Sequence, residues 1–154
     1  MACVGALRPV GLRRRLPWAL GVMMQSALLR FESSAFSIAP GEDEETNPGI
    51  FGKALAQWLS EQLATRGFKV TGVFPEDFAW CIGVDSNPHA SFVACSNTPD
   101  HNTQWGVFVV SEGGLLSRLF GKDKRQEVVA SLYSEIKEIL SASPSINALA
   151  EEAL

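Results

Sequence analysis

The sequence has few cysteines, few charges and no long apolar run, and each shortage argues against a class of protein. Its 154 residues include three cysteines and no CxxC motif, so neither a disulfide-rich domain nor a structural zinc site is indicated. No apolar stretch reaches the roughly 18–20 residues that a membrane-spanning helix needs. The net charge of −4 disfavours a nucleic-acid binder, whose surface is usually basic.

The apolar content and the charge distribution indicate one acidic domain. Hydrophobic residues make up 46% of the chain, which is enough for a core at this length. Residues 1–24 contain four arginines and no carboxylate, whereas the remainder has nine basic and 17 acidic side chains, a net charge of −8. We therefore expect a basic leader over residues 1–24, a single domain over residues 25–143 and a C-terminal tail over residues 144–154.

Three interpretations of the leader stay open. The run Arg13-Arg14-Arg15 before a short apolar stretch has the order of a secretory signal. An arginine-rich segment without acidic residues is also typical of an organelle transit peptide. In the third interpretation, translation starts at Met23 or Met24 and the protein is cytoplasmic, whereas a true targeting segment makes it exported or organellar. In each of them the leader lies outside the fold.

Two segments have helical periodicity. Asn47 is predicted to cap the first helix and Gly67 to end it, so we expect a helix over residues 48–66. Its apolar stripe consists of Phe51, Leu55, Trp58, Leu59 and Leu63. The second helix is expected between Asp123 and Pro144. Its stripe consists of Val128, Val129, Leu132, Ile136 and Ile139.

Period-2 patterns predict five strands and hence an α+β fold. One strand is expected over residues 28–38, with a bulge near Ser33. Four more follow the first helix, over residues 68–74, 77–84, 91–96 and 105–110. Short turns between the last four indicate an antiparallel arrangement. We therefore predict a two-layer sandwich: an antiparallel sheet of about five strands with both helices on one face, in the order strand, helix, four strands, helix.

Two blocks of residues carry a resemblance to known proteins. They are Asn47-Pro48-Gly49 with Gly52, Ala54-Leu55-Ala56, Trp58-Leu59, Leu63 and Gly67-Phe68, and then Glu76-Asp77 with Trp80. Over about residues 27–140 the chain is similar to small bacterial proteins of unknown function in which a comparable Glu-Asp-x-x-Trp follows the first helix. Similar chains occur among immunity-type proteins that neutralise toxins. The resemblance implies a binding function and transfers no catalytic residue.

Glu76, Asp77 and Trp80 are the candidate binding residues. The two carboxylates could receive a cationic partner, with Trp80 as an aromatic anchor. In the simpler interpretation, a carboxylate stabilises a turn and Trp80 belongs to the core. Neighbouring residues on a strand point to opposite faces, so the carboxylates are not an acid/base couple. No catalytic residue is predicted.

The residues capable of binding metal are predicted not to share a site. Asp85 and His89 lie in one expected turn, and Asp100 and His101 lie in the next. A single strand joins these turns, which places them at opposite ends of the sheet and argues against metal binding. We therefore expect no metal and no cofactor.

The two cysteines outside the leader are expected to face each other. If the hairpin is centred on residue 88, Cys81 lies opposite Cys95 and both side chains share one face. Reduced, buried thiols are the preferred interpretation, with a disulfide left open for an exported protein.

The sequence thus predicts a non-enzymatic acidic protein that binds a basic protein partner, through the open sheet face or through an edge strand near residues 29–38. The alternative is a small enzyme or ligand binder with a pocket between the first helix and the sheet, lined by Trp58, Trp80 and Trp105. A homodimer is a third option, formed through an apolar strip that comprises Leu115, Leu116, Leu119 and Phe120. Neither nucleic-acid binding nor stable membrane insertion is expected.

Overall fold

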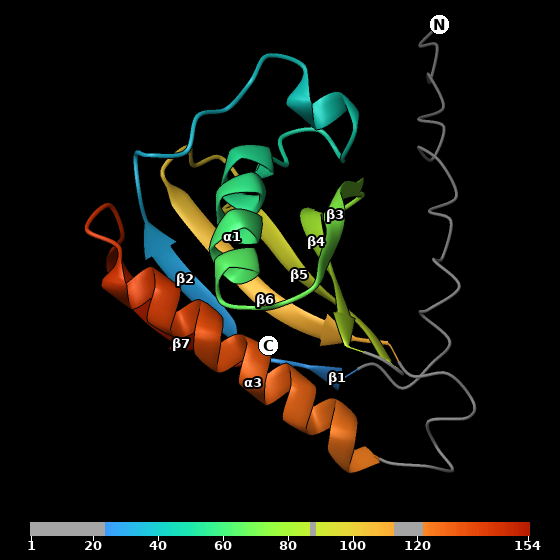
Figure 1. Cartoon of the computed structure of the whole chain (residues 1–154). Helices are drawn as coiled ribbons and strands as arrows, with labels where there is room; N and C mark the ends of the chain where they lie inside the picture. The colour runs from blue at the N-terminus through green and yellow to red at the C-terminus, as the bar shows by residue number, and fades with distance from the viewer. Residues whose placement is uncertain (1–23, 87–88, 113–121) are drawn as a thin grey trace, which may run out of the picture.

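A computed structural model describes residues 24–86, 89–112 and 122–154, which form an antiparallel sheet and two main helices (Figure 1). The α+β class is therefore confirmed. The strands are β1 (Met24–Gln25), β2 (Leu28–Glu32), β3 (Val70–Glu76), β4 (Ala79–Ser86), β5 (His89–Asn97), β6 (Gln104–Ser111) and β7 (Asn147–Glu152). The helices are α1 (Lys53–Thr65), α3 (Lys122–Ala142) and the short 3-10 helix η2 (Glu42–Glu44).

The strand order is β3-β4-β5-β6-β2-β7, with β1 beside β6, and every pair is antiparallel. The predicted edge strand near residues 29–38 is wrong, because β2 lies between β6 and β7 and ends at Glu32. There the chain turns away: the carbonyl oxygen of Ser33 accepts the indole N–H of Trp105 at 2.9 Å.

The predicted tail over residues 144–154 is also wrong, because Asn147–Glu152 form β7 at the edge of the sheet beside β2. The segment has no strand-like alternation of apolar residues. The strand is instead held by backbone pairing with β2. Glu152 adds an ion pair with Arg30 at 2.6 Å. Tertiary context therefore overrides the local sequence preference.

Strand β3 extends past the proline that was expected to stop it. Pro75 lies within Val70–Glu76 and is the register partner of Trp80. A proline is tolerated here because β3 is an edge strand, where a missing N–H does not interrupt a ladder on both sides.

Both helices lie on the same face of the sheet (Figure 1). Side chains of α1 and α3 join those of the strands in one core cluster. Its fully buried members include Leu55, Leu59 and Leu63 from α1, Leu132 and Ile136 from α3, and Ile82, Val93 and Val107 from the sheet. At about 1.5–3 kcal/mol for each large apolar side chain, this cluster is the main stabilising element of the fold.

Helix α1 begins at Lys53, five residues later than predicted, because Glu42 rather than Asn47 satisfies its first amides. One oxygen of the buried Glu42 carboxylate accepts the N–H groups of Gly52 at 2.8 Å and Lys53 at 2.9 Å. Gly52 has φ 156°, and a Cβ there would lie 2.5 Å from the carbonyl oxygen of Cys95. The close approach to β5 therefore requires glycine and sets the start of the helix.

Helix α3 ends at Ala142, two residues before Pro144, as predicted. No helix among the described residues is long and apolar enough to cross a membrane. The apolar strip over residues 115–120 and residues 1–23 of the leader lie outside the described residues, and Met24 belongs to β1.

Candidate functional site

The three predicted binding residues do not form one surface. Glu76 ends β3 and is the register partner of Ala79, so its side chain shares the face of Ala79. Trp80 is 2% exposed and lies on the opposite face, within the core under α1. It therefore presents no accessible aromatic surface to a partner.

The surroundings of Trp80 are internal to the fold. The ammonium group of Lys53 lies 4.7 Å from the centroid of the Trp80 ring, a cation–π contact, and 3.4 Å from the carboxylate of Glu45. Asp77 lies in the turn between β3 and β4, where its carbonyl oxygen accepts the N–H of Asn47 at 2.9 Å. These contacts tie the turn to the loop before α1, which is a structural role.

The space between α1 and the sheet, proposed as a ligand pocket, is occupied by packed aromatic rings. Phe36 lies 5.4 Å from Trp58 and 5.8 Å from Trp105, measured between ring centroids. Trp105 is 1% exposed, so this part of the core leaves no room for a ligand beside these rings.

The other face of the sheet carries a second apolar cluster, to which neither α1 nor α3 contributes a residue. We call it the second face. Its floor consists of small buried side chains, Ala79, Cys81 and Ala94. Around them lie the larger side chains of Phe74, Phe78, Phe92, Phe108 and Val110. The second face is therefore apolar across four neighbouring strands and the β3–β4 turn.

Phenylalanines give the second face its accessible apolar surface. Phe74 is 36% exposed, which is unusual for a large apolar side chain in this protein. Phe78 and Phe108 stack with their ring centroids 6.3 Å apart and their planes 22° apart. Stacked rings of this kind form a rigid platform at low entropic cost.

One end of the second face is hollowed. A shallow pocket of about 290 Å³ is lined by Thr71, Phe74, Gly83, Val84, Asp85, Ala90, Ser91, Phe92 and Glu112. Asp85 and Glu112 bring carboxylates to it. Asp85 forms an ion pair with Lys69 at 3.0 Å. The pocket therefore combines an apolar wall with an acidic rim.

The second face has a negative electrostatic environment. The pKa of Glu76 is raised, first by partial burial and then by the negative charges of Asp77 and Glu112. A carboxylate whose pKa rises for these reasons is stabilised when a positive charge approaches it. The arrangement thus favours cations over anions.

The cysteine prediction is wrong in its register. Trp80 pairs with Cys95, and Cys81 pairs with Ala94, so the two thiols lie on opposite faces of the sheet. Both are free and buried. Burial, with a smaller effect of the Glu76 charge, raises the pKa of Cys81 to about 12, and burial also raises that of Cys95. Neither thiol is placed to act as a nucleophile.

The turn residues that could bind metal are separated by the length of β5. Asp85 and His89 lie where β4 and β5 meet, whereas His101 follows the far end of β5. No group of three or more His, Cys, Asp or Glu side chains within residues 24–86, 89–112 and 122–154 is arranged to hold a metal ion.

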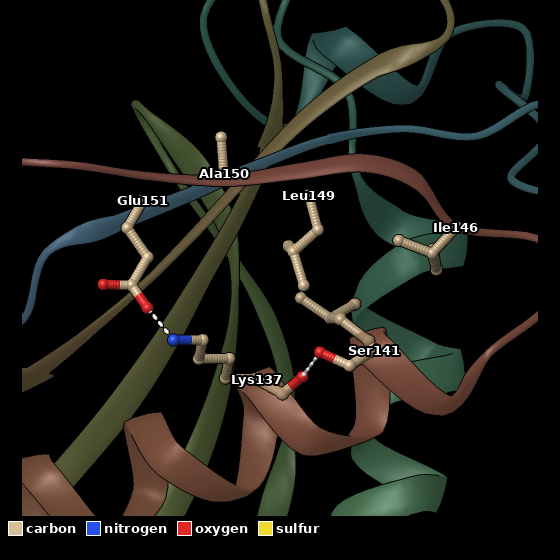
Figure 2. Close-up of a pocket in the computed structure, with 7 residues that line it drawn as sticks. Lys137, Ser141, Ile146, Leu149, Ala150 and Glu151 are labelled. Carbon is tan, nitrogen blue, oxygen red and sulfur yellow. Dashed lines mark hydrogen bonds and ion pairs between the residues drawn. The ribbon is translucent and has the colours of Figure 1, made fainter.

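A second hollow, of about 420 Å³, separates the C-terminal part of α3 from β7 (Figure 2). Leu149 and Ile146 point into it, while Ala150 points away. Lys137 and Glu151 form an ion pair across it. Charged and apolar side chains thus share this hollow, since Leu140 belongs to the main core and Ile146 and Leu149 pack against it.

Sequence reasoning named an open sheet face as a contact surface, but it did not identify the residues that form the second face. Residues 105–110 are nearly all apolar, which indicates a strand that is covered on both faces. No sequence pattern predicts that Glu112 lies near Glu76 and Phe74, because Glu112 follows β6 and the other two belong to β3.

Comparison of the chain with protein-family models, curated proteins and solved structures gives no match.

Proposed function

We propose that this chain is a non-enzymatic binding protein, a two-layer sandwich whose second face binds a basic protein. The observation that carries the proposal is the combination of the exposed Phe74 with the carboxylates of Glu76 and Glu112 on one face. An apolar centre bordered by charge is typical of protein interfaces. The resemblance to immunity-type proteins that neutralise toxins supports the same class of function.

Charge complementarity supports a basic partner. Neither Glu76 nor Glu112 has a cation within ion-pair distance among the described residues. A lysine or arginine of a partner would stabilise the charged form of Glu76, whose pKa is raised by partial burial and then by the charges of Asp77 and Glu112. The net charge of −8 outside residues 1–24 would also accelerate the encounter with a basic surface.

The face is a better docking surface than either edge of the sheet. Edge strand β3 contains Pro75 and a register shift between Val70 and Gly72. Edge strand β7 carries the adjacent charges Glu151 and Glu152. Proline, bulges and charged residues disfavour the addition of a foreign strand. A partner that lies across the face needs none of these backbone groups.

The test compares substitutions on the second face with a matched control on α1. The full chain is used as bait in lysate of its source cells, a retained protein is identified by mass spectrometry, and its Kd is measured by calorimetry at two salt concentrations. Phe74→Asp and Glu76→Lys change the second face, while Glu61→Lys makes the same charge reversal at an exposed position of α1.

We expect a basic protein that is retained by wild type and by Glu61→Lys and lost by Phe74→Asp. Glu76→Lys is expected to weaken binding about tenfold or more, with a smaller salt dependence than wild type. Circular dichroism confirms that each variant is folded. The proposal fails if no protein is retained at moderate salt, or if the retained protein binds both face variants as well as wild type.

A further inference from the structure

We propose that β7 is an exchangeable strand, and that a second copy of this chain donates its own β7 to β2 in a dimer. This inference concerns the β2 edge and does not depend on the second face. It rests on how weakly β7 is attached, on the short connection that leads to it, and on the match between β7 and the groups that receive it.

Apart from its pairing with β2, strand β7 is held through Leu149, which packs against the main core, and through Glu151, which contacts Lys137 and Tyr133 of α3. Only Leu149 of Asn147–Glu152 is partly buried, and the other five residues are exposed. The hollow of about 420 Å³ separates the strand from α3, which otherwise covers this side of the sheet (Figure 2). Release of β7 therefore exposes little apolar surface.

The strand also contains local strain. Pairing between β2 and β7 shifts register between Arg30 and Glu32, so that the extra residue lies in β7. At this bulge Ala148 has φ 53°, a left-handed conformation that favours glycine. The strain is relieved when β7 opens, which lowers the barrier to release.

The connection before β7 suits exchange. Four residues, 143–146, join the end of α3 to the strand, and Pro144 is among them. Ile146 donates its N–H to the carbonyl oxygen of Ser143, and the Ser143 and Ser145 hydroxyls lie 3.1 Å apart, so the closed connection is a tight turn. Short hinges that contain proline favour an extended path into a neighbouring molecule.

The vacated β2 is matched to another β7. Loss of the strand leaves a row of unpaired backbone groups on β2, which requires a new strand. Arg30 receives Glu152 and Lys137 receives Glu151, so an incoming strand needs two adjacent carboxylates in this register. The β7 of a second copy supplies them, along with the same bulge.

A disulfide between β2 and β7 distinguishes exchange from ordinary association. Glu32 and Asn147 are register partners, and neither belongs to the two ion pairs that hold β7. The double variant Glu32→Cys/Asn147→Cys is prepared with Cys3→Ser, held reduced at high concentration, and then diluted and oxidised. Cross-strand pairs of this kind have a geometry that a disulfide can adopt.

We expect a covalent dimer on non-reducing gels, in proportion to the dimer seen by light scattering before dilution. Deletion of Ser145 should increase the dimer fraction, and insertion of two glycines after Ser145 should decrease it. Ala148→Gly should slow the exchange about fivefold without changing the equilibrium, and Ala153→Gly is its control. Disulfides found only within single chains, whether from monomers or from a non-covalent dimer, overturn the inference.

The same measurements separate this inference from the proposed function. Phe74→Asp alters the second face and is expected to leave the dimer fraction unchanged. The Ser145 deletion is expected to leave the affinity for a basic partner unchanged.

Discussion

The two faces of the sheet are both apolar, yet they differ in side-chain size. Along β4, Trp80, Ile82 and Val84 face the helices, whereas Ala79 and Cys81 face the other way. Large side chains interdigitate with helices and are buried at 0–3% exposure. The small residues of the second face are equally buried, and phenylalanines surround them. The face under the helices therefore carries the main core, and the second face carries the smaller of the two apolar clusters.

The largest predicted effect tests the stabilising role of the covered face. Leu132→Ala is expected to lower the free energy of unfolding by about 3–4 kcal/mol, because it leaves a cavity in the main core. Phe108→Ala on the second face should cost only about 1–2 kcal/mol, because the side chain is partly exposed. Urea unfolding measures both. Equal losses would show that the two faces contribute alike.

The next effect concerns the loop that positions α1 on the covered face. Glu42→Ala removes the acceptor of two α1 amides and of the Ala39 amide, and is expected to cost about 2–3 kcal/mol. Glu42→Gln keeps one carbonyl oxygen and should cost less. Added formate can occupy the vacated position and should restore part of the loss in the alanine variant. No loss in thermal unfolding would contradict the capping role.

The rates at which the two buried cysteines are alkylated compare the two faces directly, because Cys81 lies on the second face and Cys95 in the main core. With the pKa of Cys81 raised to about 12, its reaction with iodoacetamide at pH 8 should be about a thousandfold slower than that of an exposed thiol. Cys95 lies in the main core and should react more slowly still. Peptide mass spectrometry over time gives both rates. Labelling of Cys95 before Cys81 would contradict the prediction that the main core is the less accessible of the two.

The smallest effect is electrostatic and belongs to the second face. Because the pKa of Glu76 is raised in the folded state, its contribution to stability is fully present below the unfolded pKa and is lost as pH rises through the folded pKa. Glu76→Gln should therefore be more stable than wild type at neutral pH, by less than about 1 kcal/mol, because solvent screens an exposed charge. The difference should vanish in acid, as measured by unfolding curves across pH.

Much of the fold could be predicted from local patterns. The stripe Leu55, Leu59 and Leu63 gives α1, and Gly67 marks its end because its φ of 89° is left-handed. The hairpins between β4, β5 and β6 follow from alternation and turn residues. The start of α1 could not be predicted, because its cap comes from Glu42, ten residues before Gly52.

The candidate site was less predictable than the fold. Glu76 was expected at the start of a strand beside Asp77 and Trp80, whereas it ends β3, and its neighbours on the second face are Phe74 and the distant Glu112. Trp80 was singled out with it because it is near in sequence, and the alternation of the strand directs it into the core. Proximity along a strand does not predict a shared face.

Residue order alone determines which segments become helices and strands, because spacing of apolar side chains and backbone preferences act within a few residues. It also determines the acidic charge of the domain. Tertiary structure decides the remainder: which face the helices cover, that Asn147–Glu152 become a strand beside β2, and that carboxylates from β3 and the end of β6 share one surface. These outcomes depend on contacts between segments far apart in the chain, where packing and backbone pairing outweigh local preference.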